Sequence, residues 1–220
     1  MKYKCILIDH DDTVAPTSEY IHFPSFKNSL EKLGFKEVIT FEEYINYSYD
    51  PGFENLMTDI LKLNEEKIKF IFDEWNKNTI GQIGIFYEEI KNFLIEFIQK
   101  DGIIGVVTHS TKDRIEKDYM YNLKFIPEDI YSWELGKDMR KPSIYPIENI
   151  KQKYGLSNEE ILVIDDLKPG LIMAKNGKVD FLWAGWAYKN PCFLNEMIKN
   201  STYFATNFYD FEKIVKEKLL

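Results

Sequence analysis

Residues 3–13 read YKCILIDHDDT and join an apolar run directly to an acidic cluster. The run at 3–8 is almost continuous in apolar and β-branched side chains, which is typical of a parallel strand buried on both faces. Open α/β sheets carry their chemistry beyond the carboxyl ends of the strands, where Asp9 and Asp11 would emerge. Carboxylates this close repel one another unless a cation or hydrogen-bond donors offset the charge. The stretch therefore predicts a divalent cation site, and oxygen ligands facing an open crevice favour Mg²⁺.

Taken alone, the acidic stretch has a second interpretation, a solvated turn whose side chains cap the next helix. The rest of the chain decides between the two. Its 220 residues allow one sizeable core plus an insertion, or two small domains, and 45% hydrophobic residues are enough to build a packed core. A net charge of −8 argues against nucleic acid or an anionic membrane as the partner, because both require a basic surface. An anionic substrate would then depend on local cations.

The sequence also carries signals about the compartment in which the protein works. Its two cysteines, Cys5 and Cys192, do not suggest a disulfide framework. Neither a signal-peptide pattern nor an apolar segment of 18 residues is visible. We therefore expect a cytoplasmic protein that does not associate with membranes. The oligomeric state stays open.

Residues 16–82 have a different character from the strand that precedes them. Apolar residues recur there at helical spacing, and no further buried strand is apparent. Gly34 suits the end of one helix, and Thr40 followed by Glu43 is the pattern of a capping box. The segment predicts four short helices near 26–33, 41–49, 56–63 and 68–75, which together form a small bundle. Such an insertion would stand over the carboxyl edge of the sheet as a lid.

From residue 83 the pattern alternates between strands and helices. This alternation implies right-handed crossovers and a parallel sheet, so the predicted fold is a Rossmann-like α/β core with an inserted helical cap. The predicted domains are 1–15 with 83–220 for the core and 16–82 for the cap. We expect strands at 103–107, 130–133, 161–164, 181–183 and 203–205, with helices near 87–100, 112–122, 143–154, 169–176 and 210–219.

Three further segments place polar residues next to predicted strands or helices. The strand at 103–107 is followed by Thr108-His109-Ser110, whose hydroxyls and backbone N–H groups suit phosphoryl oxygens, although a helix N-cap is the alternative. The strand at 161–164 ends in a second acidic pair, Asp165-Asp166. Between them, Pro142 is expected to open the helix near 143 and to fix Lys141 just before its N-terminus.

Together these four segments resemble the motifs of the haloacid dehalogenase superfamily, whose members use an aspartate nucleophile. Asp9-x-Asp11-x-Thr13 is similar to the first motif, which is specific, and Thr108, Lys141 and the pair Asp165-Asp166 are similar to the other three. The insertion lies where phosphoglycolate phosphatase-like members carry a helical cap. The resemblance extends over most of the chain.

The resemblance implies a magnesium-dependent phosphatase that acts on a small phosphorylated metabolite. Asp9 would be the nucleophile that forms an aspartyl-phosphate, Asp11 the general acid and base, and Lys141 a further catalytic residue. Mg²⁺ would be held by a set drawn from Asp9, Asp11, Asp165 and Asp166. Substrate binding would fall to Thr108, His109, Ser110 and Lys141. Asp11 also favours phosphorus chemistry over dehalogenation, because dehalogenases of this superfamily lack the second aspartate.

The sequence departs from the superfamily pattern at two points. Asp12 stands where many members have glycine, and Asp166 is not followed by the further aspartate that some members carry three to five residues later. The role of that carboxylate would fall to Asp166, which leaves open which member of the pair binds the metal directly.

Two other functions and several candidate substrate-reading residues stay open. A phosphomutase would use the same residues, and a catalytically idle binding domain would keep the scaffold without the chemistry. The segments 22–24 and 183–186, which contain His22, Trp183 and Trp186, are candidates for lining a cleft, although such residues are more often packed in a core.

Overall fold

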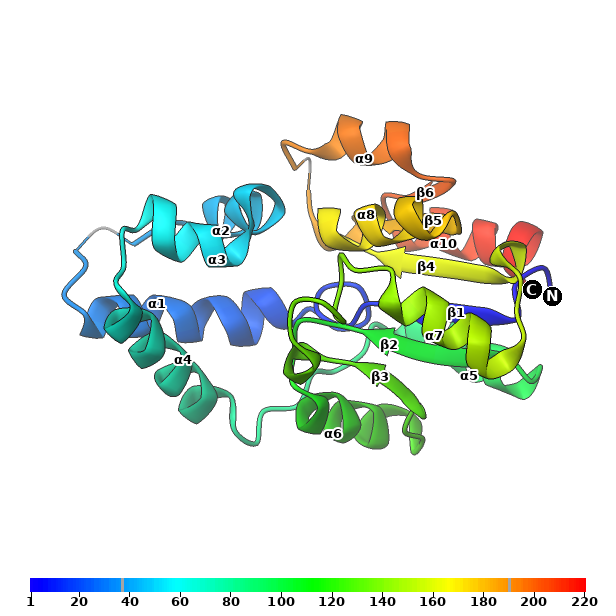
Figure 1. Cartoon of the computed structure of the whole chain (residues 1–220), viewed down its shortest axis with the longest axis horizontal. Helices are drawn as coiled ribbons and strands as arrows, with labels where there is room; N and C mark the ends of the chain where they lie inside the picture. Colours follow the sequence, from blue (N-terminus) through cyan, green and yellow to red (C-terminus); the bar gives the residue numbers. More distant parts are fainter. Residues whose placement is uncertain (37, 190) are drawn as a thin grey trace. The chain divides into compact units, whose positions relative to one another are not determined.

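A parallel six-stranded sheet forms the centre of the larger of two compact units. The computed structural model describes residues 1–36, 38–189 and 191–220. The strand order is β3-β2-β1-β4-β5-β6, and every neighbouring pair is parallel (Figure 1). The predicted Rossmann-like α/β class is confirmed. The strands are β1 (Cys5–Ile8), β2 (Ile103–Val107), β3 (Asp129–Tyr131), β4 (Ile161–Asp165), β5 (Asp180–Ala184) and β6 (Tyr203–Ala205).

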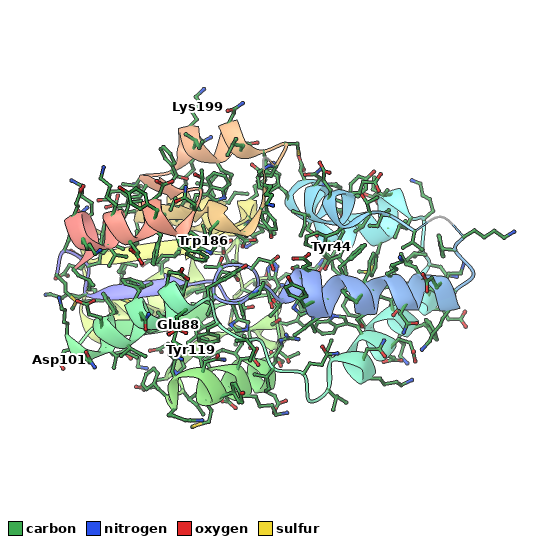
Figure 2. All side chains as sticks on the ribbon, turned by 180° about the vertical axis from the view of Figure 1, so that it is seen from behind. Tyr44, Glu88, Asp101, Tyr119, Trp186 and Lys199 are labelled. Carbon is green, nitrogen blue, oxygen red and sulfur yellow. The ribbon has the colours of Figure 1, made fainter. Side chains whose placement is uncertain are left out.

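Helices cover both faces of this sheet, as Figures 1 and 2 show from opposite sides. One face is covered by α5 (Glu88–Gln99), α6 (Lys112–Leu123) and α10 (Phe208–Ile214), whose apolar side chains join a buried cluster with Ile6, Ile8 and Leu162. The other carries α7 (Tyr145–Tyr154) and α8 (Lys168–Gly177), with α9 (Leu194–Asn200) beside α8 and β6. Because β1 and β4 are covered on both sides, their side chains are buried at nearly every position, and this explains the uninterrupted apolar runs in the sequence.

The second unit comprises residues 17–82 together with Pro191–Phe193. It contains α1 (Phe23–Lys32), α2 (Phe41–Tyr47), α3 (Phe53–Asn55) and α4 (Glu65–Thr79). Its interior is rich in aromatic rings, and Phe26 packs against both Tyr44 and Phe53. The ring of Phe193 stacks on Tyr49 with 4.0 Å between centroids, so the short segment 191–193 belongs to this unit through direct packing.

The helix boundaries predicted at Thr40 and Gly34 have the expected capping geometry, and Asn64 caps a further helix. The backbone N–H of Glu43 donates to the hydroxyl of Thr40, and the Glu43 carboxylate accepts from the backbone N–H of Thr40, which completes the capping box. The side chain of Asn64 caps α4 by accepting from the backbone N–H of Lys67 at 3.0 Å. Gly34 follows α1 with φ of +84°, the left-handed conformation that favours glycine.

Other predicted boundaries differ from the structure. The helix expected near 143 begins at Tyr145, because Pro146 rather than Pro142 occupies its first turn. The third strand ends at Tyr131, two residues early, and Trp133–Leu135 form a helical turn. Among residues 1–36, 38–189 and 191–220, the structure contains no helix with both the length and the apolar composition that crossing a bilayer requires.

The central strand gives a direct test of this packing. Ile6 is fully buried in β1, so Ile6→Ala should lower the free energy of unfolding by about 2–5 kcal/mol through lost burial and the cavity left behind. Ile172→Ala is the matched control, because its side chain in α8 is 37% exposed and should cost far less. Urea denaturation measures both. Equal losses in the two variants would contradict the assigned burial.

Candidate active site

The carboxyl ends of β1 and β4 bring two segments distant in sequence into contact. The parallel register pairs Ile8 with Ile164, and the backbone N–H of Asp9 donates to the carbonyl of Ile164 at 2.9 Å. Asp9 and Asp165 therefore leave neighbouring strands side by side. Together with Asp166 they form a buried cluster in which one oxygen from each carboxylate lies within 4.8 Å of the others. Three hard oxygen donors at this spacing are the donor chemistry that suits Mg²⁺.

Lys141 reaches this cluster from the loop between β3 and α7. Its Nζ donates to Asp9 Oδ1 at 2.5 Å and to Asp165 Oδ2 at 2.7 Å, and its side chain is 6% exposed. Burial alone would lower the pKa of this ammonium, but the carboxylates of Asp165 and Asp9 raise it above its usual value. Lys141 is therefore a fixed positive charge between two strand ends.

Asp9 still lies in an environment that disfavours its charge. Burial raises the pKa of the Asp9 carboxyl to about 6; Lys141 opposes this shift, while Asp165 and Asp11 add to it. Burial, with the charges of Asp9, Asp165 and Asp12, also raises the pKa of Asp166 well above its usual range. One lysine thus leaves the cluster short of positive charge, and a divalent cation would favour the ionised form of these carboxylates.

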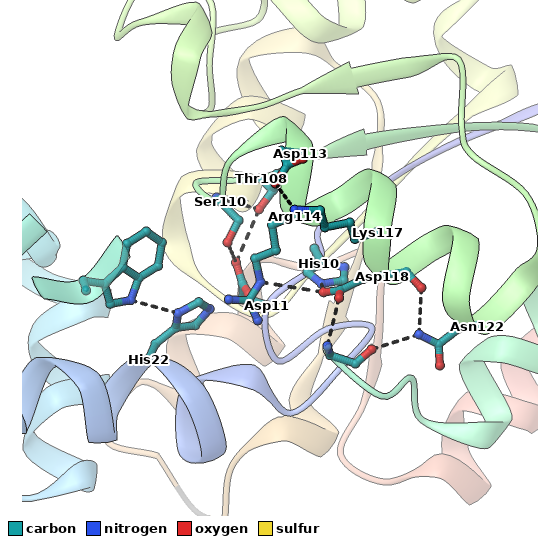
Figure 3. Close-up of polar contacts among 12 residues, drawn as sticks. His10, Asp11, His22, Thr108, Ser110, Asp113, Arg114, Lys117, Asp118 and Asn122 are labelled. Carbon is teal, nitrogen blue, oxygen red and sulfur yellow. Dashed lines mark hydrogen bonds and ion pairs between the residues drawn. The ribbon is translucent and has the colours of Figure 1, made fainter. Parts of the chain in front are cut away.

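The carboxylate of Asp11 is not part of the cluster of Asp9, Asp165 and Asp166, and it hydrogen-bonds instead to the turn after β2. Ser110 Oγ donates to Asp11 Oδ2 at 2.6 Å, and Thr108 Oγ1 lies 3.4 Å from the same oxygen (Figure 3). The hydroxyl of Thr108 also accepts from the backbone N–H of Ser110 at 2.9 Å, so the turn after β2 is internally bonded. Neither hydroxyl caps α6. The N-cap residue of this helix is Thr111, and the Thr111 side chain forms no capping hydrogen bond. The two hydroxyls thus hydrogen-bond to Asp11, and their role in substrate binding stays a prediction.

The placement of Asp165 depends on a close approach by α8. The backbone N–H of Leu167 donates to Asp165 Oδ1 at 2.9 Å, just before the helix begins. Gly170 lies against the same carboxylate, and a Cβ at this position would fall 2.3 Å from Asp165 Oδ2. A larger residue would therefore displace either the helix or the carboxylate.

A buried polar network supports His10, the residue between Asp9 and Asp11. His10 Nε2 hydrogen-bonds to Asp118 Oδ2 at 2.9 Å, and the backbone N–H of Gly84 donates to Asp118 Oδ1 at 2.9 Å (Figure 3). Arg114 forms an ion pair with the same carboxylate at 3.6 Å, although its guanidinium nitrogens have no hydrogen-bond partner among the described residues. One turn further along α6, Asn122 donates to the carbonyl of Gly84 at 2.9 Å. Helix α6 thereby ties the chain that returns from the inserted unit to the loop after β1.

The remaining predicted candidates lie in different parts of the fold. The ring of His109 bonds through Nε2 to the backbone carbonyl of Lys141 at 2.9 Å, which connects the turn after β2 to the lysine loop. The expectation that Trp183 lines a cleft is wrong: it is fully buried, and its indole donates to the carbonyl of Asp166 at 3.0 Å. Trp186 donates to the carbonyl of Thr13 and packs on Phe208, and His22 accepts from the indole of Trp75.

Sequence reasoning missed Tyr188, Asp118 and Arg114. Tyr188 follows β5, and its hydroxyl lies 2.8 Å from Asp12 Oδ2 and 2.5 Å from Asp166 Oδ2. A polar aromatic residue shortly after a strand end is the only signal that marked it. Asp118 and Arg114 lie one turn apart on a helix that carries many charges, so nothing in the sequence separated them from solvent-exposed residues.

Comparison with known proteins places the chain in a family. The model of the haloacid dehalogenase-like hydrolase family matches residues 6–184. The chain belongs to this family of hydrolases, as its motifs predicted. The phosphoglycolate phosphatase of Vibrio cholerae serotype O1 is a curated relative, 23% identical over 152 residues. The match covers 61% of this chain and 62% of that protein, less than two thirds of its length.

Solved structures show the same fold at low identity. A predicted phosphoglycolate phosphatase from Haemophilus somnus has a TM-score of 0.76 at 15% identity, with 98% of this chain and 99% of that chain covered. CbbY from Rhodobacter sphaeroides, in complex with phosphate, has a TM-score of 0.72 at 16% identity, with 94% and 95% covered. At these identities the likeness shows the fold alone.

The network around Asp118 should be a large contributor to stability. Asp118→Asn leaves the buried Arg114 cation without a counter-charge, and breaking a buried ion pair in this way costs about 3–5 kcal/mol of unfolding free energy. Asp113→Asn on the same helix is the control, because its ion pair with Lys117 is exposed. Urea denaturation compares the two, and similar small losses would show that the network adds little.

Proposed function

We propose that this hydrolase is a magnesium-dependent phosphatase that cleaves a small phosphorylated metabolite through an aspartyl-phosphate intermediate. The observation that carries the proposal is the meeting of Asp9, Asp165 and Asp166 with the Nζ of Lys141 at the ends of β1 and β4. The curated phosphoglycolate phosphatase and the phosphate complex of CbbY, which share the family or the fold, support the same class of substrate.

Asp9 is assigned the role of nucleophile. One carboxylate oxygen attacks phosphorus, the new O–P bond forms, and the bond from phosphorus to the ester oxygen breaks. Lys141, which already contacts Asp9, supplies positive charge to the transferring oxygens. Splitting the displacement into two steps leaves the second step to water, which releases inorganic phosphate and restores Asp9.

Asp11 is assigned the proton transfers. It donates a proton to the leaving ester oxygen and then accepts one from the attacking water. Hydrogen bonds from Ser110 and Thr108 orient the Asp11 carboxylate, and they leave the Asp9 carboxylate free of these two hydroxyls. In this assignment the two hydroxyls act by orienting Asp11.

Asp9, Asp165 and Asp166 would hold the cation, with the backbone carbonyl of Asp11 as a further donor. When bound, Mg²⁺ would reduce the repulsion between the carboxylate nucleophile and the anionic phosphate. Burial raises the pKa of Asp9, so the site disfavours this negative charge, and a bound cation would offset that cost. The helical unit 17–82 is assigned the selection of substrate, because it is inserted directly after the turn that carries the nucleophile.

The nucleophile is tested by a single substitution. Asp9→Asn should reduce turnover of an aryl phosphate by a factor on the order of 10⁴ or more, because an amide does not form the covalent intermediate. Asp113→Asn, on the exposed face of α6, should keep full activity. Release of inorganic phosphate is the measurement. Undiminished turnover in Asp9→Asn would reject the mechanism, and isomer formation from a hexose 1-phosphate without phosphate release would favour a phosphomutase.

The cation site predicts a stabilisation by Mg²⁺ that does not depend on substrate. An ion that binds only the folded state adds about 2.7 kcal/mol to the free energy of unfolding when it is present at 100 times its Kd. The Tm should therefore rise with Mg²⁺ concentration. Asp165→Asn should reduce the rise, and KCl at equal ionic strength controls for screening. An unchanged Tm in the wild-type protein would contradict the site.

A further inference from the structure

Two buried carboxylates of the site share one hydroxyl. Tyr188 Oη lies 2.8 Å from Asp12 Oδ2 and 2.5 Å from Asp166 Oδ2, while Asp12 and Asp166 are 4% and 1% exposed. A tyrosine hydroxyl carries a single proton and also accepts hydrogen bonds, so it can sit between two acidic groups that would otherwise face each other. Loss of this hydroxyl would leave both carboxyl groups without that buried partner.

Asp12 is held in place by its own backbone. Its φ is +65°, a left-handed conformation in which aspartate is one of the better tolerated side chains. The backbone N–H of Asp12 donates to the carbonyl of Ala15 at 2.7 Å, and that of Val14 donates to the carbonyl of His10 at 2.9 Å. The turn after β1 is therefore closed, and it presents the Asp12 carboxylate as a fixed anchor.

Asp166 is held from several directions. Thr13 Oγ1 donates to its Oδ1 at 3.2 Å, and the indole of Trp183 donates to its backbone carbonyl at 3.0 Å. Tyr188 completes this set at Oδ2, from the segment that follows β5. In this orientation an oxygen of Asp166 lies within 4.8 Å of ligand atoms of Asp9 and Asp165.

We propose that Tyr188 is a positioning residue for the cation site, and that it acts by linking the Asp166 carboxylate to Asp12 in the turn after β1. The proposal rests on the proposed function, since it requires that Asp166 take part in binding the divalent ion. Partners in the second layer of a metal site typically change metal affinity by about 10–100-fold when they are removed. The hydroxyl of Tyr188 is a partner of this kind, because it contacts the carboxylate of Asp166 and also that of Asp12 in the turn after β1.

The test measures Mg²⁺ binding by calorimetry, with no substrate present. Tyr188→Phe keeps the ring and removes only the hydroxyl, and it should weaken Mg²⁺ binding about tenfold. Tyr209→Phe is the matched control, because Tyr209 is 79% exposed on α10 and should bind Mg²⁺ like the wild type. Thermal unfolding of each variant without Mg²⁺ confirms that the fold is kept.

A double-mutant cycle with Asp12→Asn tests the link itself. If Tyr188 acts through Asp12, the two substitutions together should weaken binding by clearly less than the product of their separate effects. In a phosphatase assay, the Mg²⁺ concentration for half-maximal activity should rise in Tyr188→Phe, while kcat at saturating Mg²⁺ stays near the wild-type value. If Tyr188 had only a general structural role, its loss would lower stability without this selective change in the Mg²⁺ requirement.

Three results would overturn the proposal. The first is wild-type Mg²⁺ affinity in Tyr188→Phe, which would reject the role of Tyr188 and leave the proposed phosphatase function intact. The second is full additivity with Asp12→Asn, which would reject the link to the turn. The third is the absence of Mg²⁺ binding in the wild-type protein, which would reject the cation site and this role together.

Discussion

The structure depends on the balance of charge where β1 and β4 end. Asp9 and Asp165 emerge side by side from paired strands, and Asp166 joins them in a buried cluster. Burial raises the pKa of Asp9, and the like charges of Asp165 and Asp11 add to this shift. Lys141 offsets part of it by bonding to Asp9 and Asp165 together. A divalent cation would neutralise the negative charge that remains on the three carboxylates.

The scaffold holds this unfavourable cluster with contacts that lie outside it. On one side, Asp118 in α6 bonds to His10 and to the backbone of Gly84, which connects the loop after β1 to this helix. On the other, Tyr188 and Trp183 bring the segment around β5 against Asp166. The loop after β1 is thus positioned by α6, and the Asp166 carboxylate by the segment around β5.

The sequence predicted the α/β class, the family and the approximate position of the strands, because these follow from local pattern. A strand buried on both faces must be apolar throughout, and acidic residues directly after it mark its carboxyl end. The start of α2 at Thr40 was equally local, since a capping side chain bonds within its own first turn. The start of α7 was misplaced because two prolines, Pro142 and Pro146, both satisfied the same local rule.

What the sequence determined by itself was therefore the set of chemical groups and the order in which strands deliver them. Only the tertiary structure decided which atoms meet: that Ser110 orients Asp11, that Lys141 lies between Asp9 and Asp165, and that Tyr188 joins Asp12 to Asp166. These contacts join residues from 22 to 176 positions apart. Their geometry follows from strand register and helix packing, which act over the whole sheet and leave no signature in the neighbouring residues.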